Sequence, residues 1–368
     1  MTTEKKIVVL GAGVIGLTSA LLLKKWDSNY DITVVGAHLP GDIDIDYTSP
    51  FAGANWHSFA DADDLRLQNF DKPGYYKLIE LAENEPKSGI WVKDNISYVT
   101  DIQFKSQGSN PVSFLPWFKD FVHEFKILDK SELPDGIAFG YKFKGVIISV
   151  PIYLNYLLQE NLSIGNKVHR IAKIKNINEV RHYHSSGLKA DFVINCTGLL
   201  ANTISGFKET KRNFPVRGQV LHVRNHAKNE VSVEGFPNLN NEMLYLMPRK
   251  EGGCIIGGCF LQEFANTKVD EALTKRIIER AIKYVPELID PNYKNNPTSI
   301  DIIRTNVGLR PFRESGARVE IDEDNDWLIH NYGAGGGGYQ GSYGMCREVV
   351  RLLYEILRQE DSLTKHKL

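Results

Sequence analysis

Cysteine is scarce in this sequence, and its spacing forms no recognisable motif. The four cysteines, Cys196, Cys254, Cys259 and Cys346, are spread through 368 residues without a CxxC pair. Small secreted domains that depend on disulfides carry many more cysteines in a shorter chain. The cysteine content therefore excludes a disulfide framework and is typical of a reducing compartment.

Long apolar runs and an excess of one charge are also missing. No run reaches the roughly 20 residues that cross a membrane, and Met1 to Lys6 lead into an apolar stretch without the pattern of a signal peptide. The 44 lysines and arginines nearly balance 45 aspartates and glutamates, giving a net charge of -1. This balance indicates no surface for nucleic acid or an anionic membrane. We expect a globular protein that is neither secreted nor membrane-bound, needs no metal and acts on a small molecule.

A glycine motif near the N-terminus has the surroundings of a dinucleotide site. Gly11-Ala-Gly13-Val-Ile-Gly16 follows the apolar stretch Lys6–Leu10 and precedes a helical pattern of leucines, and a second apolar stretch lies at Ile32–Val35. Glycines in this order permit a tight turn, close approach of a pyrophosphate and packing of the helix on the strand. The motif predicts a bound dinucleotide. The acidic residue that usually binds ribose is replaced by Gly36-Ala37-His38, so the ribose must be held in another way.

A second glycine turn lies near the C-terminus. Gly333 to Gly338 follows the apolar strand pattern of Trp327 to Ile329, and apolar residues recur at helical spacing from Met345 to Ile356. Four successive glycines cost backbone entropy that a plain connection does not need. We therefore predict a ligand held against bare backbone, and the alternative is a flexible surface turn.

The middle of the chain alternates between two patterns. Asp191–Leu199 is an apolar stretch that runs into small residues, as in a parallel α/β sheet. Phe139, Tyr141 and Phe143 instead alternate with small or charged residues, as in a half-buried antiparallel strand. Further strands are predicted at 216–223, 242–247 and 254–260, followed by a helix at 269–285. The chain has no repeat or flexible linker, which suits two interleaved domains with a ligand at their junction.

Five stretches spread over nearly the whole chain carry a family likeness: Val8–Gly16, Tyr47–Trp56, Arg217–Gln219, Val307–Pro311 and His330–Gly333. Together they resemble the D-amino-acid oxidases, especially those of the yeast type. Phe51 stands where the family usually has Trp, and Cys346 where its closing signature has Ala. Neither departure removes a reacting group.

The resemblance implies an α/β fold in which a Rossmann-like, non-covalently FAD-binding domain is interleaved with a mainly antiparallel β-sheet substrate domain. Residues 1–60, 145–205 and 300–368 are expected to form the first domain, and residues 61–144 and 206–299 the second. The implied reaction is oxidation of a D-amino acid by O2 to an imino acid, which hydrolyses to the 2-oxo acid and ammonia, with hydrogen peroxide as the other product. A homo-oligomer is compatible with the sequence.

A hydride that leaves Cα directly for the flavin needs positioning more than a general base. Arg310 is expected to hold the substrate carboxylate through its planar fork, with the Tyr245 hydroxyl beside it. By resemblance, the backbone carbonyls of Gly336 and Gln340 accept from the amine. The alternatives are a surface ion pair for Arg310 and a core aromatic for Tyr245.

The residues expected to contact the cofactor share small size, a hydroxyl group or a place in the two glycine turns. They are Gly11, Gly13, Val14, Ile15, Gly16, Ser49, Gly53, Ala54, Asn55, Val168, Gly335, Gly336, Gly338, Tyr339 and Gln340.

Two residues suggest an acidic substrate. His57 follows Trp56 on the loop expected to border the pocket, and a histidine there donates to a side-chain carboxylate. Arg249 lies at alternate spacing beyond Tyr245 and would add a second positive group. Phe260 lies where a longer polar residue would reach the substrate. We interpret this as a preference for D-aspartate, with broad-range oxidation of neutral D-amino acids as the alternative. A solvated loop His57 and a surface Arg249 would favour that alternative.

Two other classes share part of the pattern. An NAD-dependent dehydrogenase would have the first glycine motif but no use for the turn at Gly333–Gly338, whereas a flavin-binding scaffold without catalysis would have both.

The C-terminal His366-Lys367-Leu368 resembles a peroxisomal address, with His in place of the small first residue. A peroxisomal import receptor is therefore an expected partner.

Overall fold

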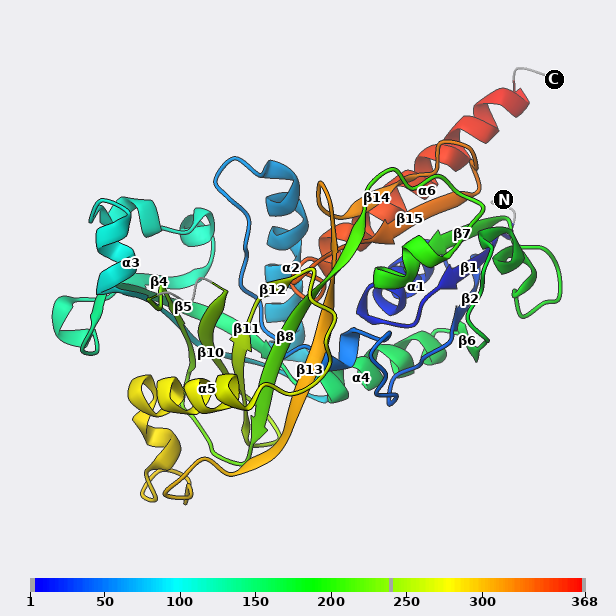
Figure 1. Cartoon of the computed structure of the whole chain (residues 1–368). Coiled ribbons are helices and arrows are strands. Elements are labelled where there is room, and N and C mark those ends of the chain that lie inside the picture. The colour runs from blue at the N-terminus through cyan, green and yellow to red at the C-terminus, as the bar shows by residue number, and fades with distance from the viewer. Residues whose placement is uncertain (1–3, 238–240, 366–368) are drawn as a thin grey trace.

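Two β-sheets organise residues 4–237 and 241–365, which this computed structural model describes (Figure 1). The first sheet contains, in spatial order, β14 (Arg318–Ile321), β15 (Leu328–Tyr332), β7 (Phe192–Asn195), β1 (Lys6–Leu10), β2 (Asp31–Gly36) and β6 (Lys167–Arg170). β14 is antiparallel to β15, and the other neighbours are parallel. Ile7 to Leu10 are at most 4% exposed, which explains why this strand is apolar at successive positions.

The second sheet is mainly antiparallel. Its spatial order is β12 (Leu261–Gln262), β8 (Asn213–Val223), β11 (Cys254–Cys259), β10 (Glu242–Pro248), β9 (Glu230–Glu234), β3 (Ile90–Thr100), β5 (Ile137–Ile148) and β4 (His123–Ile127). β3 and β9 are parallel, whereas the other neighbours are antiparallel. The predicted fold class, a parallel α/β sheet beside a mainly antiparallel one, is confirmed.

The long strand β13 (Ile302–Arg313) also belongs to the second sheet. It pairs with β8 from Asn213 to Val223, although the sequence-based division assigns residues 300–368 to the FAD-binding domain. Figure 1 shows β13 in orange, rising beside β8 towards β14 and β15 of the first sheet. The chain therefore passes from the second sheet to the first after Arg313, three residues beyond Arg310.

Three helices cover the first sheet: α1 (Val14–Trp26), α4 (Val150–Ser163) and α6 (Ser342–Lys365). The remaining α-helices of the described chain are α2 (Leu65–Asn84), α3 (Asp101–Ser106) and α5 (Glu271–Tyr284). Short 3-10 helices are η1 (Ser49–Phe51), η2 (Pro86–Ser88), η3 (Pro111–Phe114), η4 (Trp117–Asp120), η5 (Lys130–Glu132), η6 (Ile177–His182), η7 (Gly198–Thr203) and η8 (Pro286–Ile289). None of the described helices has the length and apolar composition of a membrane span.

Helix α5 shows why the sequence pattern located its helix well. The Asp270 side chain accepts a hydrogen bond from the backbone N–H of Leu273 and caps the first turn. Leu273, Ile277 and Ala281 recur at helical spacing and are at most 1% exposed against the second sheet.

Helix α2 holds the two sheets together at the second glycine turn. A Cβ atom on Gly74 would lie 1.7 Å from the backbone oxygen of Gln340, and one on Gly344 would lie 2.1 Å from that of Phe70. Only glycines permit α2 to approach α6 and the preceding turn so closely. One core cluster accordingly contains residues of both sheets, including Ile7, Val9 and Phe143.

Candidate functional site

A cavity of about 560 Å³ begins at the glycine turn after β1 and ends against the second sheet. Its walls include the loop 46–57, the turn 333–340 and inward-facing residues of β8, β9, β10 and β13. Both sequence-predicted glycine turns therefore face the same space. The surface-turn interpretation of Gly333–Gly338 does not hold, because these residues line the interior of the molecule.

The first glycine turn is shaped by backbone contacts that side chains would block. A Cβ atom on Gly11 would lie 2.4 Å from the backbone oxygen of Cys196, and one on Gly16 would lie 1.8 Å from that of Gly11. Gly16 therefore brings α1 against the turn and does not itself line the cavity. The α1 N-terminus has no side-chain cap at Gly13, and the Val14 amide donates to Ser49 Oγ at 3.1 Å.

His38 occupies the place of the missing ribose-binding carboxylate. It lines the cavity after β2, stacks on Tyr47 with ring centroids 6.0 Å apart, and lies 3.7 Å from a carboxylate oxygen of Asp44. Its Nε2 atom is buried and forms no hydrogen bond among the described residues. The Tyr47 hydroxyl donates to the carbonyl of Ala12 at 2.7 Å, which fixes this wall. A ligand hydroxyl at His38 would satisfy a polar atom that otherwise lacks a partner.

The end of the loop 46–57 is anchored to β5 by an isolated β-bridge between Asn55 and Ile147. The amide of Ala54 donates to the carbonyl of Ile148 at 3.1 Å, and the amide of Trp56 to that of Val146 at 3.0 Å. Gly53 faces Met247, whose sulfur would lie 2.2 Å from an added Cβ atom. The loop is a rigid wall because buried backbone groups here are paired.

Arg310 and Tyr245 meet at the inner end of the cavity. Arg310 Nη2 donates to the Tyr245 hydroxyl at 3.4 Å, and Nη1 donates to the carbonyl of Cys259 at 3.2 Å. The guanidinium also lies 5.2 Å from the ring centroid of Phe260. No acidic side chain pairs with Arg310 in the described part of the chain. This geometry excludes the surface ion pair and leaves a cationic fork available to an anionic ligand.

The hydroxyl of Tyr245 is a neutral donor in this setting. Burial raises its pKa, while the charge of Arg310 acts in the opposite direction. Tyr245 lines the cavity with Arg310, Gly336 and Gln340, so the four residues predicted to orient the substrate are brought together.

His57 lines the cavity but already has partners in the protein. Its Nε2 atom lies 3.2 Å from the Tyr141 hydroxyl and 3.4 Å from Ser97 Oγ. Burial lowers the pKa of His57 to about 4, so the ring is neutral at pH 7. It is neither a solvated loop residue nor a positive group.

Arg249 and Val168 do not line the cavity. Strand β10 ends at Pro248, and the amide of Arg249 donates to the carbonyl of Gly253 in the turn that follows. The expected alternation from Tyr245 to Arg249 fails because the strand stops one residue earlier. Val168 instead pairs with Val34 inside the first sheet, whereas Ile171 to Ile174 reach the cavity.

Asp71, which the sequence analysis did not single out, connects three parts of the site. It is fully buried and accepts from Ser58 Oγ at 2.6 Å and from Gln340 Nε2 at 3.0 Å. The Trp56 ring nitrogen donates to its backbone oxygen at 2.9 Å. Burial raises the pKa of Asp71 to about 7. Asp71 shares the buried face of α2 with Gly74, Tyr75 and Leu78, and this helical spacing is a sequence signal that could have identified it.

Glu230, Ser232 and Glu234 were also missed, although all three line the cavity from β9. The alternation Glu-Val-Ser-Val-Glu predicts a strand with one polar face. Polar faces usually point to solvent, so the sequence gives no reason to place these groups inside.

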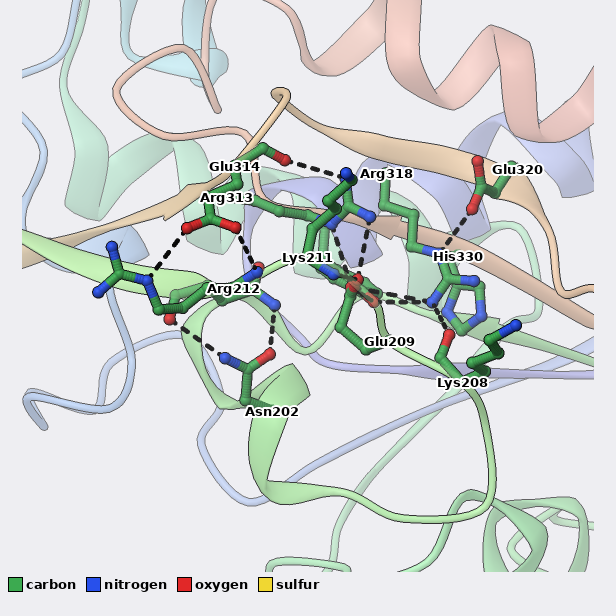
Figure 2. Close-up of polar contacts among 12 residues, drawn as sticks. Asn202, Lys208, Glu209, Lys211, Arg212, Arg313, Glu314, Arg318, Glu320 and His330 are labelled. Carbon is green, nitrogen blue, oxygen red and sulfur yellow. Dashed lines mark hydrogen bonds and ion pairs between the residues drawn. The ribbon is translucent and has the colours of Figure 1, made fainter.

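A cluster of largely buried charges, Glu209, Arg313 and Arg318, lies next to the second glycine turn, and Figure 2 shows its polar contacts. Glu209 accepts from Arg313 Nε at 3.0 Å and from the Tyr332 hydroxyl, and lies 3.8 Å from Arg318. A Cβ atom on Gly333 would lie 2.8 Å from Arg313 Cβ. The cluster therefore fixes the ends of β13 and β15 that carry the site.

Comparisons with known proteins agree with this geometry. The family model described as FAD dependent oxidoreductase matches residues 6–352. A D-amino-acid oxidase of Fusarium vanettenii is 36% identical over 358 residues, covering 95% of this chain and 97% of the relative. A D-aspartate oxidase of Talaromyces thermophilus is 30% identical over 372 residues, covering 95% of each chain. The crystal structure of glycine oxidase from Bacillus cereus has a TM-score of 0.73 at 17% identity, covers 96% of this chain and 98% of its own, and supports the fold.

Proposed function

We propose that this chain, which belongs to the FAD-dependent oxidoreductase family, oxidises D-amino acids with O2 to 2-oxo acids, ammonia and hydrogen peroxide. The predicted family membership and the predicted FAD are confirmed by the match over residues 6–352 and by the relatives. The observation that carries the proposal is an Arg310 fork that has no acidic partner among the described residues and lies beside the Tyr245 hydroxyl, in the cavity that starts at the dinucleotide turn.

The residues present fit FAD. Gly11 to Ile15 would hold the pyrophosphate, because Gly11 and Gly13 carry no Cβ atoms and the turn lies at the N-terminus of α1, where the helix dipole favours an anion. His38 would hold the ribose through its Nε2 atom, which forms no hydrogen bond with the described residues. The loop Gly53–Asn55 and the turn Gly335–Gln340 would enclose the ring. FAD, when bound, supplies a two-electron acceptor that O2 reoxidises.

The chain's own residues orient the substrate. Arg310 and Tyr245 would bind its carboxylate, and the carbonyls of Gly336 and Gln340 would accept from its amine. The substrate loses a hydride from Cα and a proton from the amine. O2 gains the two electrons and two protons as hydrogen peroxide, and water hydrolyses the imine. No side chain needs to remove the α-hydrogen as a proton.

Three residues in and near the cavity support a preference for neutral over acidic side chains. The D-aspartate interpretation needed two positive groups, but His57 is neutral and Arg249 lies outside the cavity. Glu234 lines the same space, and its carboxylate would repel a second one. We therefore propose a D-amino-acid oxidase of broad range.

A D-aspartate oxidase is the second candidate, favoured by His57 in the cavity wall and by the relative from Talaromyces thermophilus. The discriminating variant is His57→Ala, assayed by kcat/KM on D-aspartate and D-alanine. A tenfold or larger selective loss on D-aspartate, the usual effect of one hydrogen bond to a charged group, would support the second candidate. Equal losses would assign His57 to the support of Ser97 and Tyr141.

The proposed reaction is tested by peroxide release from purified protein supplied with D- or L-amino acids. We expect a yellow protein that produces peroxide with D- but not L-enantiomers. A flavin-loaded protein that is inactive on every D-amino acid would indicate a scaffold, and a colourless protein that binds NAD would contradict the proposal.

A further inference from the structure

Three polar side chains of β9 form a row on the cavity face of the second sheet. Glu230, Ser232 and Glu234 alternate with the buried Val231 and Val233, so they point to the same side. Ser232 pairs with Tyr245 of the neighbouring strand, and all three residues of the row line the cavity. The row therefore runs past the place where Tyr245 and Arg310 would hold the substrate carboxylate.

Glu230 forms the closed end of this row. It is 2% exposed, and one carboxylate oxygen accepts from the amide nitrogen of Asn55. The other oxygen is buried without a hydrogen bond in the described structure. Burial raises the pKa of Glu230 to about 8. A buried carboxyl oxygen that lacks a donor is costly, and a donor brought by a ligand would remove that cost.

Glu234 forms the open end. Its side chain is exposed to the cavity and has no hydrogen bond or ion pair among the described residues. The surrounding protein raises its pKa, so the carboxylate is incompletely solvated. Its backbone is held firmly, because Glu234 pairs with Val99 and the Thr100 hydroxyl donates to the carbonyl of Gly235 at 2.5 Å.

No cationic side chain of the described cavity wall forms an ion pair with Glu234. The described cavity wall contains Lys173, which pairs with Asp46 at 2.5 Å, and Arg310, which faces Tyr245. His57 is neutral because burial lowers its pKa to about 4. Glu230 is mostly protonated at pH 7, so Glu234 is the acidic group of this part of the described cavity wall that lacks a cation beside it.

We propose that Glu234 is a specificity-determining residue that binds the cationic end of a long D-amino-acid side chain, an ammonium or guanidinium group, with Ser232 lining the path from Tyr245. This inference rests on the proposed D-amino-acid oxidase function. The diagonal from Tyr245 to Glu234 spans about 7–8 Å between Cα atoms, and lysine carries its ammonium on a four-carbon stem. A short side chain such as that of D-alanine would not reach Glu234, and D-glutamate would be repelled.

The test compares kcat/KM for D-lysine, D-norleucine and D-glutamate, which have similar length but different charge. Variants are Glu234→Gln, which removes the charge at constant shape, and Glu279→Gln, an exposed glutamate on α5, as the matched control. We expect Glu234→Gln to lower the ratio of D-lysine to D-norleucine by about tenfold or more and to raise activity on D-glutamate. Glu279→Gln should leave both ratios unchanged. Equal ratios in wild type and Glu234→Gln would overturn the inference.

Measurements on wild type alone keep the inference testable if Glu234→Gln does not retain FAD. D-Lysine should then exceed D-glutamate in kcat/KM by at least about tenfold, and the reverse order would overturn the subsite. The two proposals fail differently. Peroxide from D-norleucine without the charge preference would refute only the subsite, whereas no peroxide from any D-amino acid by the FAD-loaded protein would refute the oxidase itself.

Discussion

Gly218 of β8 lies opposite Gly308 and diagonal to Arg310 of β13, and a Cβ atom on residue 218 would lie 2.7 Å from Arg310 Nη1. The missing side chain gives the guanidinium its place beside Tyr245. Of the Arg217–Gln219 stretch, only Gly218 lines the cavity, and it has no side chain. The stretch therefore affects the orientation of the substrate through the position of the Arg310 guanidinium.

Gly218→Ala is therefore expected to displace the guanidinium without removing it. A misplacement of about 1 Å in a substrate-positioning group can cost roughly 100-fold in activity. We expect a loss of about 10- to 100-fold in kcat/KM for D-amino acids, mainly through KM, with flavin content measured in the same preparation. An unchanged KM would show that the guanidinium finds an equivalent position.

Gly13→Val is expected to empty the cofactor site. A Cβ atom there would lie 2.8 Å from Ser49 Oγ, and a branched side chain would occupy the space of the pyrophosphate. The measurement is flavin absorbance per protein after purification, together with cooperative thermal unfolding as evidence that the variant folds. Full flavin occupancy would contradict the assigned site.

Asp71→Asn is expected to change how stability depends on pH. Burial raises the pKa of Asp71 from 3.8 to about 7, so the native state retains a proton that the unfolded chain loses. Its contribution to stability is therefore present below about pH 4 and is lost as the pH rises to about 7. Asparagine does not titrate, so the free energy of unfolding of the variant should rise relative to that of wild type across this pH window, by roughly 4 kcal/mol in total. Denaturant unfolding at pH 4 to 8 measures the free energy of unfolding, with the exposed Asp120→Asn as control. A difference between Asp71→Asn and wild type that stays constant with pH would refute the pKa shift of Asp71.

Glu209→Gln is expected to destabilise the fold through the charge cluster (Figure 2). Burial would raise the pKa of Glu209, but hydrogen bonds from Arg313 and Tyr332 lower it to about 2. A carboxylate with a lowered pKa stabilises above its unfolded value of about 4.5, and this contribution disappears as the pH falls towards 2. Loss of one partner from a buried ion pair costs roughly 3–5 kcal/mol.

The matched control is Glu323→Gln, which affects an exposed pair with Lys208. Such a pair contributes under about 1 kcal/mol. The free energy of unfolding at pH 7 should separate the two variants clearly, and the difference between Glu209→Gln and wild type should shrink below about pH 4. Equal effects of both variants would place Glu209 among ordinary surface charges.

Deletion of His366 to Leu368 tests the proposed peroxisomal address, which lies outside the residues that the structure describes. We expect a fluorescent reporter fused upstream of the intact chain to form puncta in cells and the truncated form to spread through the cytosol. Puncta that persist after truncation would assign targeting to another part of the chain.

Local features of the sequence were sufficient to predict the nucleotide-binding end of the cavity. Gly11 to Gly16 lies between a buried strand and a helix, and Gly333 to Gly338 has the same surroundings. Each turn depends on neighbours in the chain, and the absence of Cβ atoms is visible in the sequence itself. The strand before each turn and the helix after it were predicted for the same reason.

The side-chain end of the site depended on tertiary structure. The segment Glu230–Glu234 shows an alternating pattern, but the pairing of β9 with β3 and β10 decides that its polar face points inward. Pro248 ends β10 and removes Arg249 from the cavity, and packing around His57 makes it neutral. Alternation in a sequence defines two faces of a strand but not which face is buried, because burial is set by strands and helices that lie far away in the chain.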